Sequence, residues 1–241
     1  MLKKILLGTS GILVAASMAS TAANALVIDT FETGLTAGAI VLMSGSTTDL
    51  SAGAGILGGD RELILSHTGT PGTGTVAASI GGGIFTHGNT LSTGESLLRW
   101  DGTGNDVATL DFGLGNVDLT ADGNAFIHIK ALGADLITPT QSTVTLSVYT
   151  DADSYSTFTV NLPQGDSDHY ISFAALAAIV SGATAVDLTH VNAIELLAIG
   201  QTSFDVGIDI IDTTPIPEPA SLTLLGAGLM GLGAVKRRRK V

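Results

Sequence analysis

The sequence predicts an all-β protein, in which a body of short strands lies between two apolar end segments. Three stretches alternate apolar and polar residues, the pattern of a strand with one buried face. These stretches are 142–150, 155–162 and 203–212. The chain between them is rich in the turn-forming residues Gly, Asn, Asp and Thr. Many short strands joined by turns favour an antiparallel sandwich or barrel over a sheet with helical crossovers.

The alternation also predicts which side chains face the core. The inward residues expected in 142–150 are Val144, Leu146 and Val148. Those expected in 203–212 are Phe204, Val206, Ile208 and Ile210. Further strands are expected at 26–31, 39–43, 61–66, 75–80, 95–100, 107–112, 125–132, 169–173 and 191–199. An Ala-rich helix of about two turns is expected at 174–180, as a connector.

The first 25 residues have the three parts of a secretory signal peptide. Lys3 and Lys4 form a basic start, an apolar helical stretch follows, and Ala23-Asn24-Ala25 is a small-residue cleavage site. Ala23 and Ala25 are the predicted signal peptidase site, and the mature chain would begin at Leu26. This segment implies export through the Sec machinery. An uncleaved anchor helix is the alternative, which the cleavage site disfavours.

The chain ends in three parts, within residues 213–241. Pro217, Glu218 and Pro219 form an extended motif, and residues 220–235 carry no charge. At 1.5 Å per residue the uncharged segment would span about 24 Å, against about 30 Å for the apolar layer of a bilayer. We expect it to be a short transmembrane helix. Five cations follow: Lys236, Arg237, Arg238, Arg239 and Lys240. By the positive-inside rule they stay cytoplasmic, so the body lies across the membrane.

The motif, the uncharged segment and the basic tail, in this order, resemble the PEP-CTERM sorting signal of Gram-negative bacteria. The resemblance implies that an exosortase, an integral-membrane protease, recognises the tail and reads the side chain of Glu218. It also implies transit through the inner membrane, removal of the tail, and delivery to the cell surface near exopolysaccharide. A simple C-terminal membrane anchor is the alternative.

The body, residues 26–212, is expected to be one strongly acidic domain. Arg61, Arg99 and Lys130 are its only Lys and Arg residues, whereas it holds all but one of the 22 acidic residues of the chain. A surface this acidic repels nucleic acid, so we expect no nucleic-acid partner. The chain has no cysteine, which excludes disulfides, a thiol nucleophile and thiolate metal sites.

Three segments of the body resemble bacterial surface jelly rolls of the carbohydrate-binding type. They are 27–32 (VIDTFE), 58–62 (GGDRE) and 206–211 (VGIDII). The resemblance implies a jelly-roll-like antiparallel β-sandwich whose first and last strands are neighbours.

The loop 101–106 is the best candidate for a cation site. Asp101, Asn105 and Asp106 bring three oxygen-bearing side chains together with two glycines, which suits Ca²⁺. An ordinary turn between strands explains the same residues. Apart from this candidate, no cofactor is expected.

Two arginines are the candidates for binding an anionic ligand. Arg61 and Arg99 could grip a carboxylate or a sugar acid, or each could form an internal salt bridge. The body has one Trp, Trp100, and three Tyr, which is a thin supply of aromatic platforms for sugars.

The sequence lacks a Gly-x-Ser-x-Gly motif and a phosphate-binding loop, so we expect no enzyme. A non-catalytic, exported surface or matrix protein is the first hypothesis. A lectin or carbohydrate-active enzyme on the same fold is the alternative, and a self-associating adhesive subunit is the third.

Overall fold

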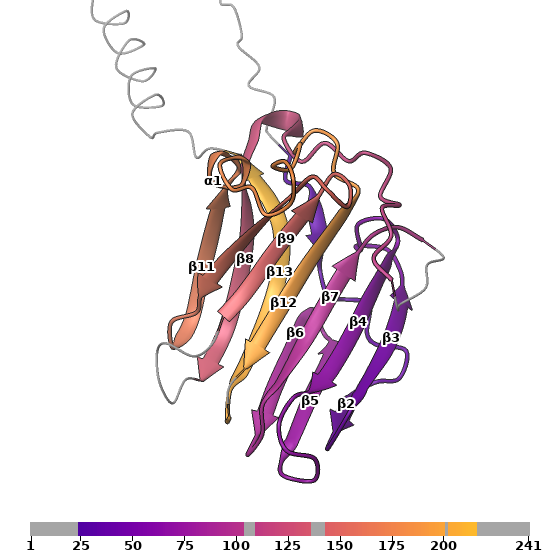
Figure 1. Ribbon diagram of the computed structural model, residues 1–241, viewed down its shortest axis with the longest axis vertical. Coiled ribbons are helices and arrows are strands. Elements are labelled where there is room, and N and C mark those ends of the chain that lie inside the picture. Colours follow the sequence, from indigo (N-terminus) through magenta and orange to yellow (C-terminus); the bar gives the residue numbers. More distant parts are fainter. Residues whose placement is uncertain (1–23, 104–108, 136–142, 201, 216–241) are drawn as a thin grey trace, which may run out of the picture.

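The computed structural model describes residues 24–103, 109–135, 143–200 and 202–215, which form two antiparallel sheets packed face to face (Figure 1). The predicted sandwich is therefore confirmed. One sheet has, in spatial order, β11 (Gly165–Ser172), β8 (Asn124–Asp135), β13 (Asp205–Pro215), β6 (Ile84–Thr90), β5 (Thr75–Gly81) and β2 (Ile40–Leu42). A seventh strand, β1 (Val27–Asp29), pairs with β13.

The other sheet has six strands in the described part of the chain. In spatial order they are β10 (Tyr155–Asn161), β9 (Thr143–Tyr149), β12 (Ala193–Gly200), β7 (Gly94–Trp100), β4 (Asp60–His67) and β3 (Ser46–Ala52). Inward side chains from both sheets make one core, and Trp100 is its largest fully buried side chain. The predicted inward row of Val144, Leu146 and Val148 is buried as expected.

Two strands were not predicted, and both place polar residues toward the core. In β3 the buried positions hold Asp49 and Ser51, while Leu50 points outward. In β6 they hold His87 and Asn89 beside Phe85. Both strands alternate between buried and exposed positions, but their hydropathy does not alternate with burial. The pattern of apolar residues therefore could not reveal them.

Two other expectations were wrong. The described residues 109–112 of the expected strand 107–112 form no strand. In β13 a register shift between Ile208 and Ile210 moves the inward position one residue along, so that Ile211 is fully buried in place of Ile210. A bulge adds one residue to the strand and reverses the faces beyond it.

The expected connector helix exists but is short. α1 (Phe173–Ala177) follows β11 directly, and the side chain of Ser172 caps it by accepting a hydrogen bond from the Ala175 amide at 3.1 Å. A 3-10 turn, η1 (Ala121–Gly123), precedes β8. Among the described residues no helix has the length and apolarity needed to cross a bilayer. The expected helices within 1–25 and 220–235 fall outside the described residues, apart from residues 24 and 25.

The first and last strands are neighbours, as the sequence resemblance implied. Val27 pairs with Asp212, and the Thr213 amide donates to the Leu26 carbonyl at 2.8 Å. The Leu26 amide donates in turn to the Thr213 hydroxyl at 2.9 Å. The two ends of the described chain therefore lie side by side at one end of the sandwich.

Candidate functional site

Strand register arranges the outward side chains of the six-stranded sheet in rows. Across β4, β7, β12 and β9, one row consists of Glu62, Arg99, Glu195 and Ser147. The next row consists of Ile64, Leu97, Leu197 and Thr145. A groove of about 240 Å³ lies over them, lined by Ile64, Ser66, Glu95, Leu97, Thr145, Ser147, Glu195 and Leu197. Its floor is thus apolar in the middle and polar at both ends.

Arg99 holds together the residues at one polar end of this groove, the end formed by Glu195 and Ser147. Its Nε donates to Glu195 Oε1 at 2.9 Å, and its Nη1 donates to Glu62 Oε2 at 3.1 Å. The same Nη1 donates to the carbonyl of Thr109 at 2.9 Å, which ties the segment after β7 to the sheet. Because Arg99 is only 7% exposed and bonded on two sides, its charge is neutralised within the protein. Of the two readings of Arg99, the internal salt bridge is the one observed.

Three aromatic side chains stand beside the Arg99 cluster. Tyr149 and Tyr155 face each other across the β9–β10 hairpin, with stacked rings whose centroids are 5.0 Å apart. Phe112, which is partly exposed, packs on Tyr149 at 6.2 Å. The hydroxyl of Tyr149 donates to Glu195 Oε2 at 2.8 Å. The aromatic group and the carboxylate therefore form one connected wall at the end of the groove.

The electrostatics of this wall follow from burial. Burial, and secondly the carboxylate of Asp101, raise the pKa of Glu62 to about 7, although Arg99 acts in the opposite direction. Glu62 is 1% exposed, and its Oε1 has no hydrogen-bond partner. Burial and the bond to Glu195 also raise the pKa of Tyr149, so its hydroxyl stays protonated as a donor.

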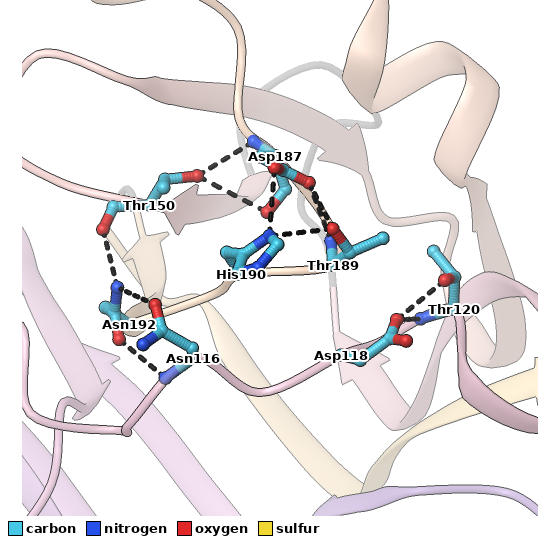
Figure 2. A network of polar contacts seen from close by, with 8 residues as sticks. All are labelled: Asn116, Asp118, Thr120, Thr150, Asp187, Thr189, His190 and Asn192. Atoms are coloured by element: carbon cyan, nitrogen blue, oxygen red, sulfur yellow. Dashed lines mark hydrogen bonds and ion pairs between the residues drawn. The ribbon is translucent and has the colours of Figure 1, made fainter.

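A polar network holds the segment that carries Phe112 against the end of the sheet (Figure 2). The side chain of Asn192, which precedes β12, accepts from the Asn116 amide at 2.7 Å and donates to the Thr150 carbonyl at 2.9 Å. Asp187 accepts from the Thr189 amide and hydroxyl at 3.0 and 2.7 Å. The loops before β8 and β12 are thereby joined to each other and to the end of β9.

Arg61 has no part in this site. Its Nη1 lies 2.9 Å from Asp29 Oδ2, and both side chains are fully buried. Asp29 Oδ2 also accepts from the indole nitrogen of Trp100 at 2.9 Å. Arg61 is therefore a structural residue that joins β1, β4 and β7 inside the core, as the salt-bridge reading of the sequence proposed.

The predicted calcium loop is only partly described. Asp101 is 1% exposed, and its Oδ2 accepts from the Asp111 amide at 2.7 Å, which is the role of a residue that closes a loop. Asn105 and Asp106 lie outside the described residues. Among the residues that are described, no group of three His, Cys, Asp or Glu side chains could hold a metal ion.

Sequence reasoning missed the Arg99 cluster as a unit. Glu62, Arg99 and Glu195 come from three strands far apart in the chain, so only the pairing of β4, β7 and β12 brings them together. The tyrosine pair left a usable signal. Tyr149 and Tyr155 each occupy a polar-face position on either side of a short turn, and a hairpin pairs such positions.

Comparison with solved structures gives distant similarities. The family 11 carbohydrate-binding module of the cellulosomal cellulase Lic26A-Cel5E of Clostridium thermocellum is 11% identical, with a TM-score of 0.39, over 83% of this chain and 99% of that one. An exo-beta-agarase is 13% identical, with a TM-score of 0.41, over 82% of this chain and 26% of that one. Similarity this low carries no argument about ligand or activity. No curated protein matches the chain.

The C-terminal resemblance is supported by a family model. Residues 215–240 match the family model of the PEP-CTERM protein-sorting motif. The match covers the Pro-Glu-Pro motif, the uncharged segment and the basic tail, and it shares only Pro215 with the sandwich. The motif residues Pro217, Glu218 and Pro219 and the cations Lys236 to Lys240 lie beyond the described residues, so their assignment rests on this match. The chain is thus a β-sandwich protein that carries a PEP-CTERM sorting motif at its C-terminus.

Proposed function

We propose that this protein is a non-catalytic, exported polysaccharide-binding protein, and that the outer face of the six-stranded sheet binds a neutral glycan. The sorting motif supports the first part, because it implies export, membrane transit and processing by an exosortase. Signal peptidase would cut after Ala25 and the exosortase would act at Pro217 to Pro219. Delivery to the cell surface places the sandwich among extracellular polysaccharides.

The groove over the six-stranded sheet is the observation that carries the binding proposal. Ile64, Leu97 and Leu197 form an apolar floor for the C–H faces of sugar rings. Glu95 and Glu195 at its two ends accept hydrogen bonds from sugar hydroxyls. In the described part of the chain no free cation faces the groove, because Arg99 is already neutralised by Glu62 and Glu195. These features favour a neutral sugar chain and disfavour a uronic acid.

The absence of catalysis is inferred from the same cluster. A glycosidase that works with two carboxyl groups holds them on either side of the scissile bond, and an inverting enzyme also leaves room for a water. Here the guanidinium of Arg99 bonds directly to both Glu62 and Glu195. The jelly-roll-like class that the sequence resembles, and association with the host's exopolysaccharide, belong to this proposal.

Calorimetry with the secreted, processed protein tests the binding site. The probes are neutral hexasaccharides of glucose, xylose and N-acetylglucosamine. We expect at least one to bind, and both Tyr149→Ala and Leu197→Asp to weaken it at least tenfold. Asp122→Asn, in the loop before β8, serves as a control that leaves binding unchanged. Binding that survives both groove variants, or no binding by any of the probes, would refute the site. Release of reducing ends from a bound probe would refute the non-catalytic assignment.

A further inference from the structure

The outer face of the seven-stranded sheet carries an exposed aromatic platform. Tyr170 on β11 is 58% exposed, and its ring stacks on His128 of β8 with centroids 4.7 Å apart and planes inclined by 15°. Phe126 packs its edge against Tyr170 at 6.3 Å. This platform lies on the other sheet from the groove described above, so the two surfaces are separate.

The platform is held rigid from beneath. His128 Nδ1 is 3.0 Å from Asp212 Oδ1, and its Nε2 is 2.9 Å from Asp168 Oδ1. With both ring nitrogens bonded, to β13 on one side and to β11 on the other, the imidazole cannot turn. Tyr170 therefore rests on a fixed support, and a ring held in place in advance costs less ordering entropy when a ligand stacks on it.

A broad groove of about 680 Å³ lies further along the same face, and Phe126, His128 and Tyr170 are not among its lining residues. Its lining residues on the central strands are small, and include Ala77, Gly88 and Gly207. Gly88 leaves room for the carboxylate of Asp205, since a Cβ on residue 88 would lie 2.3 Å from Asp205 Oδ1. Asp166, on the same strand as Tyr170, lines the groove as well.

Charge decides which ligand this face suits. The acidic residues on it are Asp166, Asp168, Asp205, Asp209 and Asp212. Lys130 is the only Lys or Arg of the body that is not bound into the Arg61 or Arg99 clusters, and it already pairs with Asp209. The carboxylates on this face therefore outnumber the cations, which favours a cationic ligand and excludes uronic acids and phosphates.

We propose that this face is a second glycan-binding site, specific for a polysaccharide of hexosamines with free amino groups. One sugar ring of the polysaccharide stacks on the open face of Tyr170. The ammonium groups of other sugar units in the same chain bind Asp166 and Asp205 along the groove. The protein then holds a sugar chain on each side of the sandwich. This second site does not depend on the first, and each can fail without the other.

Calorimetry with a glucosamine hexamer, on the secreted protein, tests this site. We expect Tyr170→Ala to weaken binding at least tenfold, and the double variant Asp166→Asn with Asp205→Asn to do the same. Asp118→Asn with Asp122→Asn is the matched control, since it removes the same charge from the loop before β8. Tyr149→Ala, in the neutral-glycan site, should leave glucosamine binding unchanged.

The control variants separate a built site from general attraction to an acidic protein. If the control pair weakens binding as much as the Asp166 and Asp205 pair, the attraction is nonspecific and the proposal is wrong. It is also wrong if Tyr170→Ala has no effect, or if the N-acetylglucosamine hexamer binds this face equally well. If none of the neutral hexasaccharides binds while the glucosamine hexamer does, only the first site is refuted.

Discussion

His87 is a titratable side chain inside the core, where it joins the two sheets. It points inward from β6, is 1% exposed, and its Nδ1 lies 2.7 Å from the hydroxyl of Ser96 on β7. Phe204 packs on the ring at 5.8 Å. Burial lowers the pKa of His87 to about 4, so the imidazole is neutral at pH 7.

This histidine should make the protein sensitive to mild acid. In the unfolded chain its pKa is about 6.5, so between pH 6.5 and about 4 only the unfolded chain takes up the proton. The free energy of unfolding therefore decreases as the pH is lowered across this window, by about 3 kcal/mol in all. Urea denaturation at pH 7 and pH 4.5 measures this loss. The double variant His87→Phe with Ser96→Ala, which leaves no unpaired partner, should lose about 3 kcal/mol less.

Glu62 has the opposite effect on the pH dependence of stability. The wild type must therefore be compared with the His87 and Ser96 double variant to isolate the effect of His87. Its folded pKa of about 7 lies above the unfolded value of 4.5. The folded protein therefore holds an extra proton between these values, and this contribution to stability is lost as pH rises through 7. Equal pH dependence in the wild type and the double variant would show that His87 is not the acid-sensitive group.

At the scale of elements, two of the five non-glycine residues with left-handed backbone in the described part of the chain differ in how the strain is offset. Phe31, just after β1, has φ 55°, and its amide donates to Asp29 Oδ1 at 2.7 Å. Its ring is fully buried and packs on Phe85. Leu91, in the turn between β6 and β7, also has φ 55°, yet its side chain is 73% exposed. Packing offsets the strain at Phe31, whereas nothing in the structure offsets it at Leu91.

The turn between β6 and β7 is therefore open to stabilisation. Leu91→Asn, or Leu91→Gly, should raise the free energy of unfolding by about 1 kcal/mol, because these residues tolerate left-handed backbone. Phe31→Gly, the matched change at a buried site, should lower it by about 3–5 kcal/mol through loss of core packing. Chemical denaturation of the three proteins measures both effects. A destabilised Leu91→Asn would mean that the turn conformation is not strained.

At the scale of the whole molecule, the pairing of β1 with β13 joins the two ends of the sandwich. Leu26 and Thr213 exchange two hydrogen bonds, and Pro215 is the last residue of β13. The sorting motif therefore begins directly after a strand of the core, at the same end as the predicted signal peptidase site. Leu26 and Pro215, the described residues next to the two predicted processing sites, therefore lie at one end of the molecule, while the groove and the platform lie on its two broad faces.

Processing of the sorting motif has a direct test in the native host. Glu218→Ala should leave the full-length, C-terminally uncut protein in the inner membrane, because the enzyme is proposed to read this side chain. Fractionation and mass spectrometry of the mature C-terminus measure the outcome. Glu32→Ala, an acid-to-alanine change in the body, should be exported and cut like the wild type. A Glu218→Ala protein released and shortened in the same way would exclude this role for Glu218.

The sequence by itself determined what depends on short-range pattern. Alternation in 142–150 and 155–162 predicted β9 and β10, because one face of each strand is apolar and the other polar. The order of motif, uncharged segment and cations predicted the sorting signal, because such a signal is read as a linear peptide. For Arg61 and Arg99 the sequence left two interpretations open, and the internal salt bridge that the structure shows is one of them.

Only the tertiary structure decided which polar residues are inside and which residues share a site. β3 and β6 bury Asp49 and His87. Asp49 accepts from the Thr36 amide, before β2, and His87 bonds to Ser96 on a strand of the other sheet, which hydropathy does not record. The two candidate binding faces likewise depend on strand register. Glu195 meets Arg99, and Tyr170 meets His128, only because sheets pair strands that are distant along the chain. Hydropathy is known from each residue alone, whereas a site depends on which strands pair and in which register.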